Sequence, residues 1–461
     1  MQTLQSLDSL QPAIAAMRDL QPAPQQLVYQ VKLITPMYGG GVIAGEADKA
    51  MPFRTRSLRG QLRFWWRVAM MGDQPVDSAG RPVAHDAKTW RQKERDIWGG
   101  LTTDSTCASN VGLHIDQIRD IRTVHCDKVI AQNPKLGYVL FSGKSNPRES
   151  VVGQHVVEAG AQFRLIVTVI DPALLDTVHQ TIRYWATFGG IGARTSRGLG
   201  AVCVTQNLAD GGTRVLCVLP AKVLAENFIG NGAAQAITVN VKGAIKPFVA
   251  PAVYGQATIA WEAGIGKLWQ FRQAPVLARH PPGGDKIPGL SFWPKADTVR
   301  DATGSYTPPH KPLSTRKGLH HIPEADFGLP IVLKFKDGPK GASDKIGYDP
   351  AMREILPADL EQTRMASPLI LRPVALPEGN GFFCVAILIH RAKIECRDPA
   401  LPLLSHVRLA PDAQAGHPAT YSVQTNDWAP SLAPYLTGVA YPKATNAVEM
   451  FLNYFCARGA V

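Results

Sequence analysis

The sequence predicts an α+β protein of two domains, each with an antiparallel sheet that carries its helices on one face. Two observations support this prediction. The first half alternates strand-like and helix-like segments in the order strand, helix, strand, strand, helix, strand. The chain of 461 residues is too long for one ordinary domain, and a second, more decorated domain of the same class fits the rest of the chain. We expect a tail over residues 1–26, a first domain over 27–206 and a second over 207–461.

The first half is predicted to contain two helices among four strands. Ser57 can cap the first helix, and Gly72 can end it. Asp171 can cap the second helix, which has Pro172 at its first position and runs to Phe188. The strands are predicted at residues 27–35, 110–121, 162–170 and 199–206. This order is the ferredoxin-like split β-α-β pattern, which RNA-recognition domains share.

The remaining segments are less regular. A hairpin is expected around residues 138–141, within the irregular stretch 123–161. The second half is predicted to be a further ferredoxin-like (RRM-like) domain with insertions. Its expected elements are strands at 237–245 and 327–337, a hairpin of 367–376 with 382–390, and a helix at 445–458.

Composition narrows the functional class. The formal net charge is +12, from 49 basic and 37 acidic residues, and indicates a polyanionic partner. The seven cysteines form no C-x-x-C pair, so reduced thiols are expected and neither a zinc ribbon nor a disulfide framework. The first 26 residues do not read as a signal peptide, and the longest apolar run, residues 382–389, is too short to cross a bilayer. We expect a cytoplasmic protein without a membrane partner.

The first candidate binding segment reads RTRSLRGQLRFWWR, from Arg54 to Arg67, and no acid occurs between Asp48 and Asp73. In a helix, arginines spaced four residues apart stack on one face. A glycine in the first turn leaves backbone N–H groups open to an anion. The predicted phosphate-binding residues are therefore Arg54, Arg56, Arg59, Gly60, Arg63 and Arg67, with Trp66 as the candidate to stack a base.

This interpretation has a plain alternative. Basic helix faces are usually only solvated, and Trp65 and Trp66 could both belong to the core. The absence of nearby acids and a second segment of the same kind favour binding.

The second candidate segment, residues 188–202, reads FGGIGARTSRGLGAV, and no acid occurs from 177 to 209. Glycines let backbone amides approach a phosphate, and arginines neutralise it. The segment is neither a Walker loop nor a dinucleotide fingerprint, because it lacks G-K-[ST] and leads from a helix into a strand. The predicted residues are Gly190, Gly192, Arg194 and Arg197. The alternative is a tight glycine turn. We expect the two segments to converge on one nucleotide chain.

These motifs resemble a known family. The glycine-rich segment before the last strand of a ferredoxin-like domain is similar to the signature of the RAMP superfamily of CRISPR effectors. The sequence ITPMYGGG at residues 34–41, followed by the arginine-rich segment, resembles the first subunit of the type III-B (Cmr) RNA-targeting complex. Motifs at 292–300, 327–331 and 365–373 resemble that family's second half. Ser196 stands where a further basic residue is expected, and Lys295 where an acid is usual.

The resemblance implies an RNA-binding subunit without a catalytic centre, in a ribonucleoprotein of antiviral defence. It implies guide (CRISPR) RNA and target single-stranded RNA as ligands and other RAMP subunits as partners. The subunit would lie beside the small RAMP subunit and hold the 3′ part of the guide, while guide pairing reads the sequence. The second half adds Arg300, Arg364 and Ser367 as candidate RNA contacts.

Two other functions are open. Related proteins include guide-processing endoribonucleases, which need a base near the 2′-hydroxyl and a cation. The available histidines are His125, His155, His179, His320 and His321, but none lies in either arginine-rich segment. A mainly structural capping subunit is the other alternative. The acids Asp96 and Asp104 alone indicate no metal site, so we expect no metal, no cofactor and no catalytic residue.

Overall fold

The computed structural model describes most of the chain in ordered segments. These are residue 11 and residues 23–41, 46–48, 50–71, 87–101, 106–147, 150–220, 237–273, 291, 293–312, 320–339, 343–377, 381–390, 406–410, 420–423 and 446–456. The predicted N-terminal tail and the predicted helix end at Gly72 lie outside these segments, apart from the tail's residue 11 and its last few residues.

The first sheet confirms the predicted ferredoxin-like order. Its five strands are ordered β4-β7-β1-β8-β9, and every neighbouring pair is antiparallel. The strands span β1 Gln25–Leu33, β4 Val111–Arg119, β7 Gln162–Val169, β8 Val202–Asn207 and β9 Thr213–Val215. Strand β1 therefore lies in the centre between β7 and β8, as the split β-α-β pattern requires.

Two amphipathic helices, α2 (Thr55–Met70) and α6 (Leu175–Phe188), cover one face of this sheet. Helix α2 begins two residues earlier than predicted. Arg54 occupies its N-cap position without a side-chain cap bond, so the prediction that Ser57 caps the helix was wrong. Helix α6 follows a 3-10 turn, Pro172–Leu174, and Asp171 caps that turn by accepting a bond from the Ala173 N–H (2.9 Å). The predicted cap at Asp171 is confirmed.

Two insertions decorate the first domain. Helix α3 (Ala87–Trp98) and the short pair β2 (Gly100–Leu101) and β3 (Thr106–Cys107) follow α2. A second insertion lies between β4 and β7, where β5 (Thr123–His125) pairs with β6 (His155–Val157). Between these strands the chain forms α4 (Cys126–Gln132), η1 (Pro134–Leu136), α5 (Gly137–Leu140) and η2 (Phe141–Gly143). The predicted hairpin around residues 138–141 is therefore wrong, because this segment is helical.

The second domain repeats the strand order in reduced form. Its sheet is ordered β10-β11-β15-β14, from β10 Ile237–Thr238, β11 Ile245–Tyr254, β15 Phe382–Ile389 and β14 Leu369–Ala375. The predicted hairpin of β14 with β15 is confirmed, as is the C-terminal helix α12 (Ala447–Cys456). Helix α8 (Ala257–Gln273) was not predicted. Strand β10 precedes β11 in the chain, yet it occupies the place that a fourth strand would take in a complete repeat.

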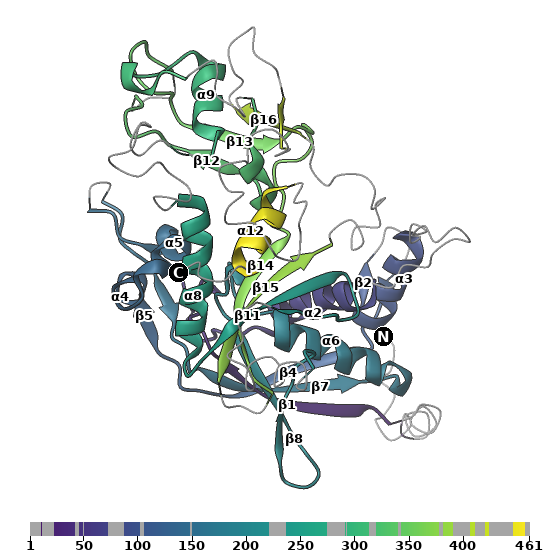
Figure 1. The fold of residues 1–461 in the computed structure, drawn as a ribbon. Helices are drawn as coiled ribbons and strands as arrows, with labels where there is room; N and C mark the ends of the chain where they lie inside the picture. Colours follow the sequence, from purple (N-terminus) through teal and green to yellow (C-terminus); the bar gives the residue numbers. More distant parts are fainter. Residues whose placement is uncertain are drawn as a thin grey trace, which may run out of the picture.

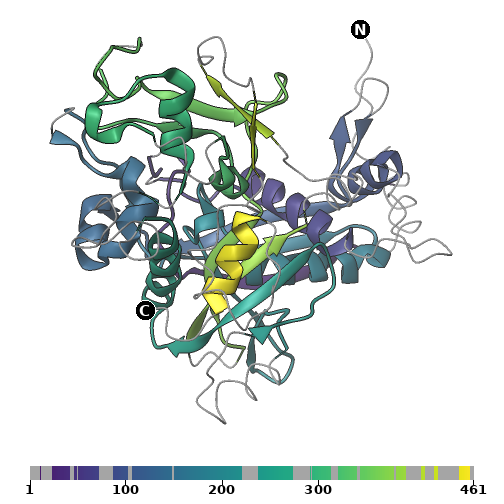
Figure 2. The same cartoon turned by 45° about the horizontal axis from the view of Figure 1, so that its top comes forward.

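A third, smaller unit combines two insertions of the second domain. Helix α9 (Lys295–Thr303), β12 (Ile331–Leu333) and β13 (Arg353–Pro357) precede β14, whereas β16 (His406–Ala410) and β17 (Tyr421–Ser422) follow β15. The four strands form one sheet in the order β12-β13-β16-β17, with a core of its own. This unit lies at the top of Figure 1 and comes forward in Figure 2. The predicted strand 327–337 is shorter than expected, since η7 (Pro323–Phe327) occupies its start.

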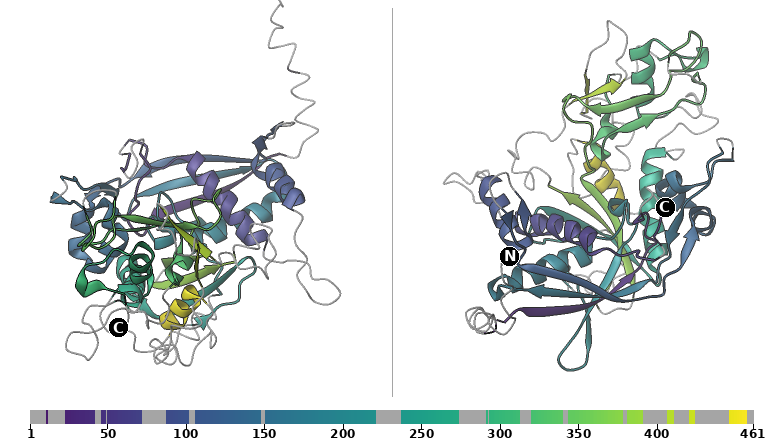
Figure 3. Two further views of the ribbon diagram at one scale, coloured as in Figure 1. Left: turned by 90° about the horizontal axis from the view of Figure 1, so that it is seen from above. Right: turned by 180° about the vertical axis from the view of Figure 1, so that it is seen from behind.

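The two larger domains share their cores. Helices α2 and α6 lie between the first sheet and the second, in one apolar cluster with Val249, Val374 and Phe383 (Figures 1 and 3). The opposite face of the second sheet packs against α8 and α12, and the helical insertion of the first domain joins that cluster through Leu136 and Val139. The second sheet is thus covered on both faces. No helix in the described segments has the length and apolarity that a membrane span requires.

One buried carboxyl couples the fold to pH. Asp326 in η7 accepts a hydrogen bond from the Ala447 N–H, at the start of α12 (2.9 Å). Burial, with a smaller contribution from the charge of the nearby Glu449, raises the pKa of Asp326 to about 7. A carboxyl whose pKa is higher in the folded state stabilises the fold while it is protonated, and this contribution is lost as the pH rises from about 4 to about 7.

We therefore expect Asp326→Asn to flatten the dependence of stability on pH. The amide keeps an acceptor for Ala447 but cannot ionise. The free energy of unfolding of the variant, relative to that of the parent, should therefore increase by roughly 1–4 kcal/mol from pH 5 to pH 8. Urea unfolding at both pH values measures this difference. Asp359→Asn, at an exposed carboxylate, should leave the profile of the parent unchanged. Parallel profiles for Asp326→Asn and the parent would contradict the assignment.

Candidate nucleic-acid interface

The arginine ladder of α2 is partly neutralised by one acid from α3. Glu94, with only 7% of its side chain exposed, accepts bonds from the Nε atoms of Arg63 (2.7 Å) and Arg67 (2.8 Å). Burial alone would raise the pKa of Glu94, but the hydrogen bonds and charges of Arg67 and Arg63 hold it below its ordinary value. Both arginines hold α3 against α2 and share one carboxylate, and their prediction as phosphate ligands stays untested.

Two further arginines of this segment also have partners within the protein. Arg59 donates to Ser109 Oγ (2.6 Å) and to the carbonyl oxygens of Trp98 (3.3 Å) and Val111 (2.8 Å). Arg54 pairs with Asp48 at 2.9 Å. Arg59 therefore fixes the α3 end and the start of β4 to α2. Arg59 uses both of its terminal nitrogens in these bonds, whereas Arg54 uses one nitrogen and its charge is offset by Asp48.

Trp66 belongs to the core. It is 2% exposed and meets the Trp90 ring edge-on, with the ring centroids 5.7 Å apart. The prediction that it stacks a base is wrong. Trp65 and Trp66 both belong to the core, as the alternative interpretation of the sequence had it. Arg56 and Gly60 are exposed, and Arg56 makes no ion pair within the described segments. These two positions keep the surface access that the prediction required.

We expect Trp66→Ala to act on stability and not on RNA affinity. Truncation of a buried tryptophan removes apolar contacts and leaves a cavity, which costs about 3–5 kcal/mol. Urea unfolding should show this loss, whereas Phe141→Ala, at a ring that is 66% exposed, should cost far less. A stable Trp66→Ala protein with weakened RNA binding would restore the stacking prediction.

The glycine-rich segment is a joint between the domains. Gly198 and Gly200 have positive φ angles of 83° and 63°, and a Cβ on Gly200 would collide with the Ile191 carbonyl. Gly190 is buried and pairs with Ala201. Gly192, whose φ is also positive, lies against the Tyr38 carbonyl. These glycines allow backbone to pack on backbone, so the prediction that Gly190 contacts phosphate is wrong.

Arg197 points into the second domain. Its guanidinium donates to the carbonyl of Leu369 (2.7 Å), to Ser367 Oγ (3.1 Å) and to the carbonyl of Phe327 (3.3 Å). In return, Trp261 Nε1 of α8 donates to the Arg197 carbonyl (2.7 Å). Burial lowers the pKa of Arg197 to about 10, so the group stays charged at neutral pH. Arg197 and Ser367, both predicted as RNA contacts, bind each other.

Arg194 points the other way, toward the helical insertion. It adopts a left-handed conformation (φ 60°) and donates to the Val139 carbonyl (2.8 Å). Its guanidinium lies over the rings of Tyr38 (5.7 Å) and Phe141 (5.1 Å). A non-glycine residue in this conformation is uncommon and is found disproportionately at functional sites.

A third guanidinium completes a cluster of Arg194, Arg197 and Arg272. Arg272 of α8 lies over the Phe327 ring at 4.8 Å and has no ion pair within the described segments. The charges of Arg272 and Arg194 both lower the pKa of Arg197, and no carboxylate contributes to that shift. This arginine cluster keeps its positive charge at the junction of the two domains. It is the best candidate on the described surface for holding phosphates.

The sequence prediction missed Tyr38, Phe141 and Arg272. Tyr38 lies within the motif ITPMYGGG, which was already noted in the sequence, so this motif could have pointed to it. Phe141 and Arg272 come from an insertion and from an unpredicted helix; tertiary packing brings Phe141 to Arg194 and Arg272 to Arg197. The arginines of α2 bond to α3 and β4, whereas Arg194 bonds to the insertion, so these contacts do not unite the two predicted segments.

A comparison with known families assigns this part of the chain. Residues 30–203 match the family model of the RAMP superfamily. These residues belong to the RAMP superfamily. The RAMP domain so defined contains the glycine-rich segment, both helices of the first sheet and the insertion that holds Phe141. A search among curated proteins found no match in sequence.

Several solved structures align with this chain, at low sequence identity. Cmr1 from Pyrococcus furiosus in its apo form aligns with a TM-score of 0.41 and 13% identity, over 79% of this chain and 88% of that one. A chain of the type III-B Cmr-beta complex bound to cognate target RNA aligns at 0.40 and 11%, over 81% and 99%. Cmr6 from Pyrococcus furiosus aligns at 0.22 and 14%, over 39% and 97%.

Outside the RAMP domain, some of the remaining residues singled out in the sequence form ion pairs with acids and others do not. Arg300 is 11% exposed and bonds to Asp297 (2.9 Å) and Asp349 (2.9 Å), so its prediction as an RNA contact was wrong. Lys295, which stands where an acid is usual, pairs with the buried Glu324 (2.9 Å). Arg364 is exposed and makes no ion pair in the described segments, so its prediction stands untested.

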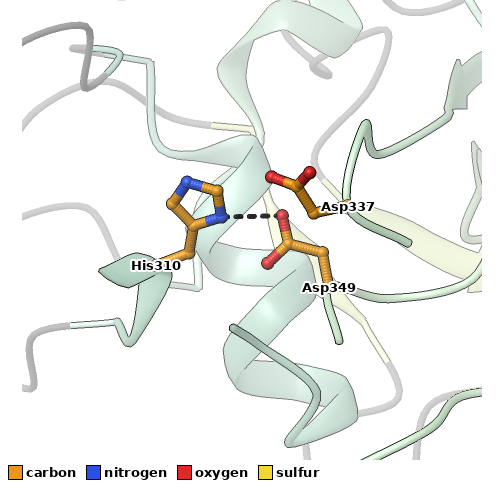
Figure 4. Close-up of side chains that lie close together, drawn as sticks. All are labelled: His310, Asp337 and Asp349. Atoms are coloured by element: carbon orange, nitrogen blue, oxygen red, sulfur yellow. Dashed lines mark hydrogen bonds and ion pairs between the residues drawn. The ribbon is translucent and has the colours of Figure 1, made fainter. Parts of the chain in front are cut away.

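One group within the described segments could hold a metal ion. His310, Asp337 and Asp349 place one donor atom each within 4.8 Å of one another, in the third unit (Figure 4). Asp349 already accepts bonds from Arg300 Nε (3.2 Å) and Nη2 (2.9 Å), and His310 Nδ1 lies 2.9 Å from the same carboxylate. A cation would have to share Asp349 with a guanidinium. In the arrangement shown, the group is an ion-pair network that joins η6 (Pro308–His310) to α9.

Proposed function

We propose that this chain is an RNA-binding subunit, without a catalytic centre, of a type III-B CRISPR ribonucleoprotein. In this role it holds the 3′ part of the guide RNA and helps to capture target RNA, beside other RAMP subunits. The observation that carries the proposal is the arginine cluster at the junction of the RAMP domain with the second domain, whose partners in the described segments are carbonyl oxygens, a hydroxyl and aromatic rings. The net charge of +12 and the motifs of the first half support it.

The three arginines of the cluster have different roles in this proposal. Arg197 is fixed by carbonyl oxygens and supplies positive potential without needing to contact the phosphates itself. Arg194 and Arg272 are only half-buried and rest on aromatic rings, which leaves N–H groups for phosphate oxygens. Such contacts position a backbone without reading its sequence, which suits a complex in which base pairing supplies specificity.

We expect Arg194→Ala combined with Arg272→Ala to weaken binding of single-stranded RNA and to reduce its salt dependence. Loss of two phosphate contacts should lower the slope of log K against log salt by about 1.4, at about 0.7 per contact. Fluorescence anisotropy over a salt series measures both quantities. Lys336→Ala with Lys345→Ala removes the same charge from exposed sites of the third unit and should change little. An equal loss in both double variants would reduce the effect to net charge and refute the site.

A guide-processing endoribonuclease is the second candidate, and one feature favours it. His125 and His155 face each other across β5 and β6 with ring centroids 5.1 Å apart, and His155 is exposed. The sequence named both histidines without predicting that they meet. A histidine pair next to the insertion could supply an acid and a base.

We expect purified protein to leave repeat RNA intact in the absence of other subunits. Gel analysis of the incubated RNA checks this. Specific cleavage that is lost in His125→Ala and His155→Ala, but kept in His114→Ala at an exposed histidine of β4, would establish the ribonuclease instead. If the isolated chain shows no RNA affinity and gains it only with other RAMP subunits, the structural capping role is favoured.

A further inference from the structure

Phe141 presents an aromatic ring to solvent beside the arginine cluster. The side chain is 66% exposed, although the residues just before it, Val139 and Leu140, are buried against α8. Single exposed apolar side chains are common on protein surfaces, so exposure alone does not single out Phe141. What distinguishes this ring is that it is exposed and also contacts a guanidinium of the arginine cluster.

The ring is held in place from behind. Arg194 lies between Tyr38 and Phe141, and its bond to the Val139 carbonyl ties the guanidinium to the same short helix that ends at Phe141. The Tyr38 hydroxyl bonds to Gln154 and lies 3.4 Å from Ser142 Oγ, next to Phe141 in the chain. The cation therefore supports one face of a ring whose remaining surface is open.

We propose that Phe141 stacks one unpaired nucleobase of the RNA strand whose phosphates Arg194 and Arg272 hold. The proposal rests on the proposed function and adds to it a subsite for a base. Every base offers a π-face, so this contact tolerates any sequence, as a guide-directed complex requires. The guanidinium next to the ring is that of Arg194, whose partners in the described segments are a carbonyl oxygen and two aromatic rings, and its positive charge favours a nucleic acid over an apolar protein surface.

The test compares substitutions at Phe141 in binding of a mixed-sequence single-stranded RNA oligonucleotide. Loss of one stacked base costs about 1–3 kcal/mol, so Phe141→Ala and Phe141→Leu should weaken binding by about 5- to 150-fold, whereas Phe141→Trp should keep it. The salt slope should stay unchanged, since no charge is lost. Val152→Ala, at an exposed apolar side chain of the same insertion, is the matched control and should bind as the parent does.

A second probe separates stacking from a structural effect. On an oligonucleotide of abasic sites, which keeps the phosphates but lacks bases, the parent and Phe141→Ala should bind equally. An equal loss on both probes would overturn the proposal. So would unchanged RNA affinity of Phe141→Ala together with loss of binding to another subunit, which would make Phe141 a protein contact.

The two proposals fail in different ways. If Phe141→Ala binds RNA normally while Arg194→Ala with Arg272→Ala does not, the base subsite is wrong and the phosphate site stands. If all these variants bind as the parent does, the proposed RNA interface falls, and the base subsite falls with it.

Discussion

A buried guanidinium holds the two larger domains together. Arg372 of β14 is 0% exposed, and it donates to the carbonyl oxygens of Gly189, Ala186 and Val202. Two of these carbonyls lie at the C-terminal end of α6, where unpaired acceptors and the negative end of the helix dipole favour a cation. Burial lowers the pKa of Arg372 to about 9, and the group still carries its charge at neutral pH. A side chain of the second domain thereby binds carbonyl groups that are unpaired at the end of α6, a helix of the first domain.

The shape of the glycine-rich segment follows from this joint. Arg372 fixes its start at Gly189, and the bonds of Arg197 with Leu369 and Trp261 fix its second half. With both parts held by the second domain, Arg194 is the arginine of the segment that turns toward the helical insertion. The interface proposed for RNA is therefore a property of two domains, and neither domain alone would present Arg194, Arg272 and Phe141 together.

Local sequence patterns correctly predicted the elements that depend on residues close together in the chain. The strand order of the first sheet, the cap at Asp171 and the hairpin of β14 with β15 all follow from periodicity and turn residues. Strand β11 was placed too early, since Pro247 and Pro251 within it are poor strand formers by local rules. The third unit could not be predicted, because its sheet joins segments on either side of β14 and β15. Trp66 was misassigned because Trp90 and Glu94, which fill that side of α2, come from another helix.

Arginine content alone could not locate the interface, because the chemistry of each arginine's bonding partner decides whether its positive charge is cancelled. Glu94 brings a full negative charge to Arg63 and Arg67, so these two cations and one buried anion carry a net charge of +1. Arg59 on the same helix bonds to carbonyls and a hydroxyl, which leave its charge in place. The partners of Arg194 and Arg197 are carbonyl oxygens, a hydroxyl and aromatic rings, which orient a guanidinium without cancelling its charge. A phosphate approaching the first group would compete with a carboxylate, and one approaching the second would not. The same sequence signal, a run of arginines without nearby acids, therefore produced a structural clamp in α2 and a candidate binding site at the domain junction.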